Sequence, residues 1–416
     1  MMDSQPPFDW SALVQAVLSI LGAGFYLATG VLLLILAGAA SVMNLPSQQA
    51  FVAASLGWSA LLIGVLNLPS ALHAIGRLSG RALPEISTPR LNWLAAVLVL
   101  FLPLLLVLGN LVAPDDGLAW LLLPPLQLLV VGIPLLWLYR AGSARLPGNP
   151  PSRQWALVSF GLVIVQMLAI VLEVVLLLGI LTVGLSIFSL QPGAIEMLER
   201  LTTRLTYAMG SPEALMRILE GIINHPLVLF VGIALTAVLI PLLEELLKPL
   251  GLWFFGGRQL TPAQGFQAGM LAGLTFALME SLGNLANPLG DQWALVAVGR
   301  LGTGVLHITT SALVGWGMAS AWRDRRYWHL SGAFLLAVFL HGCWNLFGIL
   351  LGLAEFLDPA LASNVVLLRL GGIAPFAMGV LMITMVFILM GANRRLRAAA
   401  VDETDEPLVN MSQITG

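Results

Sequence analysis

Ionisable residues inside otherwise apolar stretches are the side chains of this chain most able to do chemistry. They form four short motifs in its second half: Glu244, Glu245 and Lys248; Phe276 and Glu280; Arg300 and His307; and His341 and Asn345. A charged residue at the centre of a membrane-spanning helix costs about 2.5 to 3.5 kcal/mol. Such groups must therefore be paired or hydrated, and a cluster of them indicates a functional site.

The first motif has the adjacent carboxylates that acid–base chemistry uses. Glu244 and Glu245 cannot both be readily ionised in a medium of low dielectric constant, so one is expected to act as an acid and the other as a base. Lys248 is four residues after Glu244 on the same helical face and is expected to pair with it. Pro241 and Pro249 flank the motif and predict kinks. A structural pair of Glu244 with Lys248 would leave Glu245 without a role.

The second and third motifs add groups that could bind a substrate or move a proton. Phe276 and Glu280 share one helical face. Arg300 and His307 also share a face, on a stretch rich in Gly, Ser and Thr that lets a neighbouring helix approach closely. Each of these residues could alone be a packing or interfacial residue. Their occurrence on successive apolar stretches favours a common site.

The fourth motif could stabilise a developing negative charge. His341 and Asn345 lie one turn apart on the same face, which suits an oxyanion or a substrate carbonyl. Counting residues from the expected ends of the helices places all four motifs near the middle of the membrane. We therefore expect them to converge on one cavity.

The composition predicts the elements that carry these motifs. The chain has 416 residues, of which 58% are hydrophobic and only 10% are charged, whereas soluble proteins have about 25% charged residues. A spanning helix needs about 20 mostly apolar residues. The sequence predicts an all-α, polytopic membrane helix bundle of about ten spans, near residues 12–40, 50–76, 91–113, 118–139, 154–188, 226–255, 264–286, 293–320, 329–352 and 364–391.

The distribution of arginine predicts the orientation in the cell membrane. With the N-terminus inside, the arginines gather in the inner loops, as at Arg77 and Arg81, whereas the short outer loops are acidic. Basic residues favour the cytoplasmic side, so both termini are expected to be cytoplasmic. The net charge of −2 gives no indication of a nucleic-acid partner. Membrane lipids are the expected partners of so apolar a chain.

Four regions follow from these patterns. Residues 1–190 form a five-helix membrane region whose role the sequence leaves open. Residues 191–225 are an extracytoplasmic segment with charges at helical spacing, which predicts one or two short amphipathic helices. Residues 226–392 form the membrane core that carries the motifs. Residues 393–416 form a polar cytoplasmic tail.

The order of the four motifs resembles the PrsW family of intramembrane proteases, within the wider type II CAAX protease group. The resemblance covers roughly residues 226–352 and departs where Ser281 replaces the usual Asn. It implies an endopeptidase that cleaves membrane-associated proteins. The implied catalytic residues are Glu244 and Glu245, which activate a water, Glu280 and His307, which position it, and His341 and Asn345, which stabilise the oxyanion; Lys248, Arg300 and Phe276 would support them.

Two questions stay open at this stage. No cofactor is predicted, but zinc is possible, and Glu280, His307 and His341 could then be its three ligands. The chain has no His-Glu-x-x-His helix, which favours a metal-free glutamate mechanism. The alternative functions are a proton-coupled transporter, which also uses buried Glu, His and Arg, and a non-catalytic scaffold.

Overall fold

Helices are the only regular secondary structure in the residues that the computed structural model describes, namely 8–43, 45–81, 83, 89–114, 117–209, 211–223, 225–257, 259–287, 290–356 and 365–412. The predicted all-α class is therefore confirmed. The helices belong to two compact units. The larger unit comprises residues 1–166, 245–337 and 382–416, and the smaller unit comprises residues 167–244 and 338–381.

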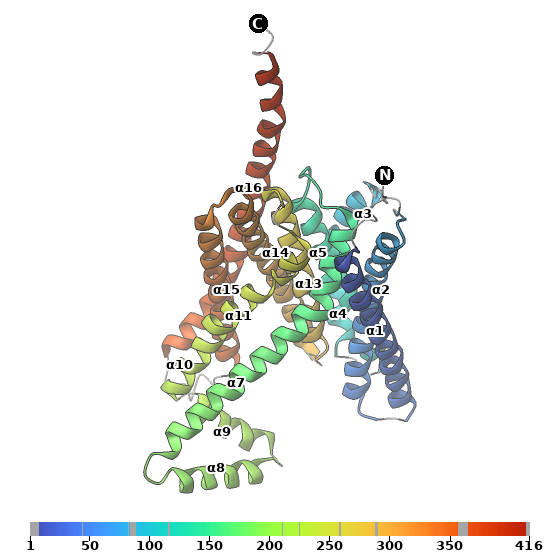
Figure 1. The fold of residues 1–416 in the computed structure, drawn as a ribbon. Coiled ribbons are helices and arrows are strands. Elements are labelled where there is room, and N and C mark those ends of the chain that lie inside the picture. Colours follow the sequence, from blue (N-terminus) through green and yellow to red (C-terminus); the bar gives the residue numbers. More distant parts are fainter. Residues whose placement is uncertain are drawn as a thin grey trace. The chain divides into compact units, whose positions relative to one another are not determined.

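The larger unit contains two closely packed helix pairs, α1 with α2 and α13 with α14. Figure 1 shows α1 and α2 lying side by side along their length. The helices of this unit are α1 (Trp10–Val42), α2 (Ser47–Leu78), α3 (Pro89–Leu100), α4 (Leu102–Val112), α5 (Ala119–Gly142), α6 (Pro151–Phe160), the π-helix η1 (Gly161–Val165), α12 (Leu250–Phe255), α13 (Pro262–Leu285), the 3₁₀ turn η3 (Gly290–Gln292) and α14 (Trp293–Asp324).

The smaller unit contains the predicted amphipathic segment. Two short helices form there, the number that the charges at helical spacing allowed. Its helices are α8 (Ala194–Ala208), α9 (Pro212–Ile223), α10 (Pro226–Ala234) and the π-helix η2 (Leu235–Leu239). Four further helices pass from one unit to the other: α7 (Gln166–Ser189), α11 (Ile240–Leu247), α15 (Tyr327–Phe356) and α16 (Val365–Ser412).

A capping box fixes the start of α13. The backbone N–H of Gln264 donates to Thr261 Oγ1 at 3.2 Å, and the Thr261 N–H donates to Gln264 Oε1 at 3.1 Å. These bonds satisfy two of the N–H groups that a helix start leaves unpaired, and Pro262 suits the first helical position. The register of α13 is thereby set, and Glu280 follows five turns later.

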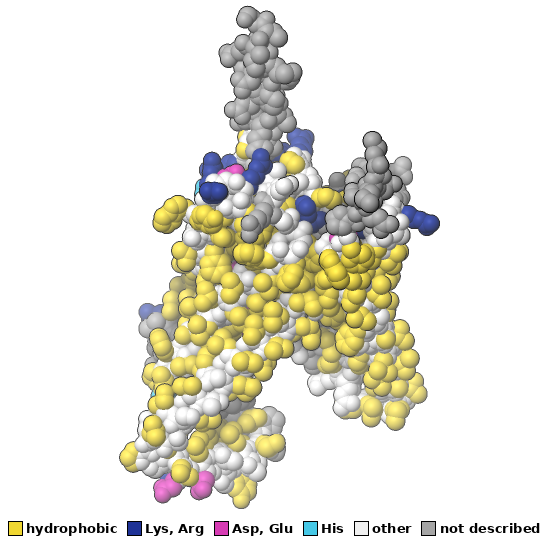
Figure 2. Space-filling model, viewed as in Figure 1, with side chains coloured by type: hydrophobic (Ala, Val, Ile, Leu, Met, Phe, Trp, Pro, Cys, Tyr) yellow, Lys and Arg dark blue, Asp and Glu magenta, His cyan; other side chains and the backbone are white. Residues whose placement is uncertain are grey.

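The predicted number of spans is approximate. Within the described residues, seven helices are long and apolar enough to cross a membrane, or eight if the bent pair α3 and α4 forms one span. The predicted ten include α13 and α14, whose glycines and polar residues leave them less apolar than the others. Elsewhere the surface is rich in hydrophobic side chains (Figure 2); Leu21 on α1 is 67% exposed and Leu72 on α2 is 60% exposed.

Candidate active site

The π-helical turn η2 of the smaller unit precedes Glu244 and Glu245 in the chain. The N–H of Ile240 bonds to the carbonyl of Leu235, five residues back. The carbonyl of Thr236 thereby loses its usual α-helical donor, and Asn345 Nδ2 of α15 donates to it at 2.9 Å. An Asn side chain has two N–H donors, so this bond leaves a second donor for other use. Asn345 thus joins α15 to the irregular turn before the glutamates.

The backbone of α15 also approaches this turn closely. A Cβ atom added at Gly342 would collide with the carbonyl oxygen of Ala237. In a regular α-helix, the N–H of residue 241 would donate to the carbonyl of Ala237. Pro241 has no N–H, so it cannot form this bond. Where a kink was predicted at Pro241, the structure has a π-helical turn just before this residue, and Gly342 packs against that turn.

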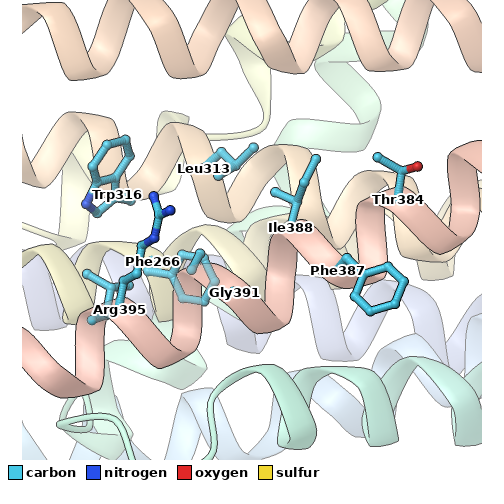
Figure 3. Close-up of a pocket in the computed structure, with 10 residues that line it drawn as sticks. Phe266, Leu313, Trp316, Thr384, Phe387, Ile388, Gly391 and Arg395 are labelled. Atoms are coloured by element: carbon cyan, nitrogen blue, oxygen red, sulfur yellow. The ribbon is translucent and has the colours of Figure 1, made fainter.

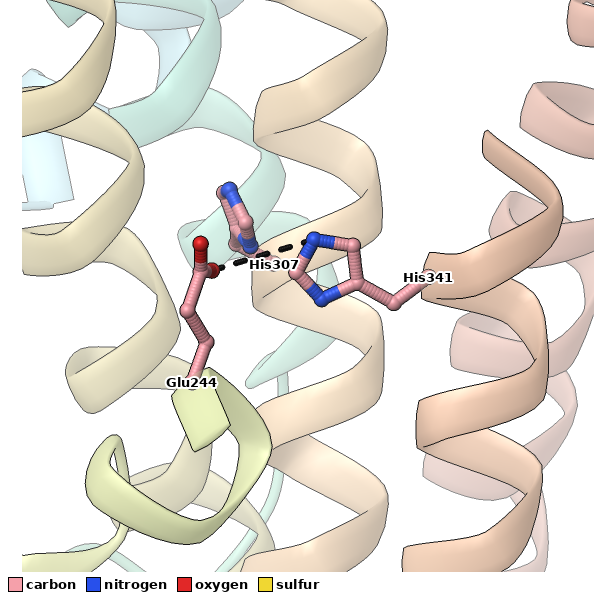
Figure 4. A group of neighbouring side chains, drawn as sticks. All are labelled: Glu244, His307 and His341. Atoms are coloured by element: carbon pink, nitrogen blue, oxygen red, sulfur yellow. Dashed lines mark ion pairs between the residues drawn. The ribbon is translucent and has the colours of Figure 1, made fainter. Parts of the chain in front are cut away.

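Glu244 and His341 are brought together in the smaller unit. Oε2 of Glu244 and Nε2 of His341 are 3.7 Å apart, and both residues are buried (Figure 4). This separation is too long for a direct hydrogen bond, but both atoms could bond to one water that lies beside them. A carboxylate and an imidazole at this distance can hold a water and take its proton.

In the larger unit, Lys248 pairs with Glu245, whereas its spacing predicts Glu244. Helix α11 ends at Leu247, so Lys248 lies in the turn before Pro249 and no longer follows the i, i+4 geometry. Lys248 Nζ is 2.7 Å from Glu245 Oε1, and both side chains are fully buried. Thr310 Oγ1 donates to the same oxygen at 3.1 Å. The break at Pro249 thus selects the second glutamate as the partner of the lysine.

His307 is held between two charged side chains of the larger unit. Lys248 Nζ is 2.8 Å from its Nδ1, and Glu280 Oε2 is 2.6 Å from its Nε2. An ammonium group only donates hydrogen bonds, so Nδ1 is the acceptor. The proton of the neutral ring is then on Nε2, which donates to Glu280. Both ring nitrogens are engaged.

Arginine completes the network around Glu280. Arg300 Nη2 is 2.8 Å from Glu280 Oε2, and Arg300 Nε donates to Ser281 Oγ at 3.3 Å. Ser281 is the position at which the sequence departs from the usual Asn of the family it resembles. A serine oxygen there accepts a bond from the guanidinium, so the departure is compatible with the charge pair.

Phe276 supports two members of the network. Its ring meets the His307 ring edge to face, with centroids 5.1 Å apart, and Lys248 Nζ lies 4.7 Å from the centroid of the Phe276 ring. A cation over an aromatic face is stabilised by the ring quadrupole. The predicted supporting residues Lys248, Arg300 and Phe276 therefore all contact a charged or histidine side chain of the larger unit.

The glycines that bring α13 and α14 together were not predicted from the sequence. Gly265, Gly269 and Gly273 recur at every fourth position of α13, and added Cβ atoms there would collide with the backbone of α14. At Gly273 the collision would be with the carbonyl of His307. Small residues at i and i+4 are the known signal for close helix packing in membranes.

The nine predicted site residues therefore fall into two groups. The smaller unit brings together Glu244 and His341 and contains Asn345. The larger unit brings together Glu245, Lys248, Phe276, Glu280, Arg300 and His307. Glu244 and Glu245 are consecutive, so one peptide bond joins the two groups.

Comparison with known proteins agrees with the resemblance seen in the motifs. Residues 150–392, more than half of the chain, match the model of a family described as PrsW family intramembrane metalloprotease. The match begins ahead of the predicted core and includes residues 150–225. No curated protein and no solved structure matches the chain. The protein is a multi-pass membrane peptidase, and it belongs to the PrsW family.

Proposed function

We propose that the chain is an intramembrane endopeptidase in which Glu244 activates the water that attacks a peptide bond. The observation that carries this proposal is the buried pair of Glu244 and His341, whose facing atoms are 3.7 Å apart, in a chain of a membrane protease family. A water between them could lose a proton to the carboxylate while the imidazole holds its oxygen. The substrate is a membrane-anchored protein.

The reaction divides into two proton transfers. The oxygen of the water forms a bond to the peptide carbonyl carbon as Glu244 takes one of its protons. Donors such as His341 and the second N–H of Asn345 would stabilise the negative oxygen that results. Protonated Glu244 then gives the proton to the leaving amine as the C–N bond breaks, and the base is restored.

We assign different roles to the two adjacent glutamates. Glu245 is neutralised by Lys248 and receives a further bond from Thr310, so it fixes the turn rather than taking part in proton transfer. The peptide bond between the two glutamates keeps the Cα atoms of Glu244 and Glu245 about 3.8 Å apart. We propose that the Glu280–His307 pair of the larger unit positions the water or the substrate, the role that the resemblance gives it.

A metal ion is the alternative activator of the water, as the family description suggests. Glu244, His307 and His341 each have one atom of a type that zinc binds. Glu280, the carboxylate first predicted as a ligand, already forms an ion pair with Arg300 and accepts a hydrogen bond from His307. His307 does not fit, because its Nδ1 accepts from Lys248 and its Nε2 carries the proton. We therefore propose no step that uses a metal.

The proposal is tested with the purified full-length protein and a panel of single-span reporter proteins. Glu244→Gln should lower turnover about 10²- to 10⁴-fold, the usual contribution of a general base. His341→Ala should also lower it strongly. Glu196→Gln and His225→Ala, exposed residues of the same unit, are matched controls and should leave turnover unchanged. Equal processing by the wild type and Glu244→Gln would exclude this mechanism.

Removal of metal shows whether Glu244 or a metal ion activates the water. With glutamate as the base, turnover should survive dialysis against excess EDTA, and added Zn²⁺ should not raise it. The metal content of the active protein, measured by mass spectrometry, is the control. Loss of turnover on chelation that zinc alone restores would show that the metal mechanism is correct.

A further inference from the structure

A cavity lies in the larger unit, apart from the residues assigned to catalysis. Its volume is about 570 Å³, and it is bounded by α13, α14 and α16. Phe266, Leu313 and Ile388 make its apolar wall (Figure 3). Phe387 is 72% exposed at its border, so the cavity opens on the surface of the helices. A groove of this kind has room for a hydrocarbon chain.

The groove has a polar end that carries a charged side chain and a second end that carries none. Figure 3 shows Arg395 beside Trp316 at one end and Thr384 beyond Phe387 at the other. The lining residues of α16 extend from Thr384 to Leu396, which is about 18 Å at a rise of 1.5 Å per residue. Half of the hydrocarbon core of a bilayer is about 15 Å thick. The groove therefore matches one acyl chain of one leaflet.

Positive charge gathers at the polar end. Arg394 and Arg395 are exposed on α16, and Figure 2 shows Lys and Arg side chains around the base of that helix. Tryptophan is enriched where a membrane meets water, and Arg can bind a phosphate through two parallel hydrogen bonds. These features suit an anionic lipid headgroup.

The wall formed by α16 is held in place by hydrogen bonds. Asn393 Nδ2 donates to the carbonyl of Gly142 at 2.7 Å and to that of Ala144 at 3.1 Å. Asn393 is buried, and it lies two residues from Arg395. The end of the groove that carries the arginine is thus fixed against the end of α5.

We propose that this groove is a binding site for an anionic phospholipid. One acyl chain lies along Phe266, Leu313 and Ile388, and the headgroup phosphate binds Arg395 beside Trp316. By the predicted orientation, the lipid belongs to the cytoplasmic leaflet. This lipid site does not depend on whether Glu244 or a metal ion activates the catalytic water.

Native mass spectrometry of the delipidated full-length protein tests this site. The probes are phosphatidylglycerol, phosphatidylcholine with identical acyl chains, and inorganic phosphate. The wild type should bind one phosphatidylglycerol more tightly than phosphatidylcholine, and phosphate should not displace it. Arg395→Gln should weaken phosphatidylglycerol binding about fivefold, the effect of one basic residue near an anionic surface. Arg394→Gln, the neighbouring arginine outside the lining, should change it less than twofold.

A second pair of variants tests the groove itself. Gly391 lines it, and an added Cβ there meets no atom within 4 Å, so Gly391→Leu should fill the space and abolish binding. Gly379→Leu, at another open glycine of the same helix, should bind as the wild type does. Equal affinity for the two lipids, equal losses for the two arginine variants, displacement by phosphate, or unchanged binding by folded Gly391→Leu would each overturn the proposal.

Discussion

Two neighbouring residues of one type have different surroundings in this protein. Glu245 is fully buried against Lys248 and Thr310, whereas Glu244 faces His341 across 3.7 Å. The sequence predicted that the two carboxylates would differ, but its spacing paired Lys248 with Glu244, whereas the structure pairs it with Glu245. The pairing depends on where the helix ends, which the spacing does not show. The turn at Lys248 is what selects Glu245.

Lys248 is also the only lysine of the chain, which has 18 arginines. Its compact ammonium group meets Glu245, His307 and the ring of Phe276 within one buried space. A guanidinium is planar and larger, so it cannot replace this geometry. The residue type, and not only the charge, is therefore required here.

Replacing this lysine should destabilise the protein strongly. Lys248→Met leaves Glu245 buried without its cation, which typically costs about 3 to 5 kcal/mol. Glu245→Gln added to Lys248→Met should restore much of the loss, since it removes the buried charge. Chemical unfolding in detergent micelles measures both variants, with Arg200→Met on exposed α8 as the control. A Lys248→Arg variant as stable as the wild type would contradict the geometric argument.

At the scale of elements, the close contact of α13 with α14 positions the histidine network. The glycines of α13 allow the backbones to touch, and the contact at Gly273 is with the residue that bonds Lys248 and Glu280. The sequence indicated close approach from the glycines around His307 alone. The glycines of α14 alone could not show that α13 is the helix that approaches it, because the partner is set by tertiary packing.

Adding one methyl group at this contact should disturb the network. Gly273→Ala would push α14 away at His307, at a cost of about 1 to 3 kcal/mol for an overpacked contact, and turnover should fall with the loss of the 2.6 Å and 2.8 Å bonds. Gly283→Ala, in open space on the same helix, should be neutral or stabilising by about 1 kcal/mol. Unfolding and turnover of the two variants are to be compared. Equal behaviour would mean that the contact tolerates separation.

Hydropathy identified most elements but not the irregular ones. The long apolar runs gave helices where expected, and charges at helical spacing gave α8 and α9. The π-helical turn at Leu235–Leu239 was not predicted, because a one-residue change of hydrogen-bond register leaves no mark in hydrophobic periodicity. Its consequence, the bond from Asn345 to Thr236, was missed for the same reason.

For the whole chain, the helices that carry the network are less apolar than those around them. Helices α13 and α14 pack on each other and on α5, and most of their residues are buried. A helix enclosed by protein needs no uniformly apolar surface. For this reason α13 and α14 do not pass a test for spanning helices that uses length and composition alone. The number of crossings must instead be established by locating the connecting segments.

Single-cysteine labelling locates those segments. The arginine bias predicts that the α14–α15 connection is cytoplasmic and that α8 is outside. In a Cys343→Ala background, Tyr207→Cys on α8, where the native side chain is 85% exposed, should react with a membrane-impermeant maleimide in intact cells. Asp324→Cys at the end of α14 should react only after permeabilisation, and it leaves every arginine in place. The reverse pattern would mean that the chain is inserted the other way, and labelling of both in intact cells would mean that the connecting helices do not all cross.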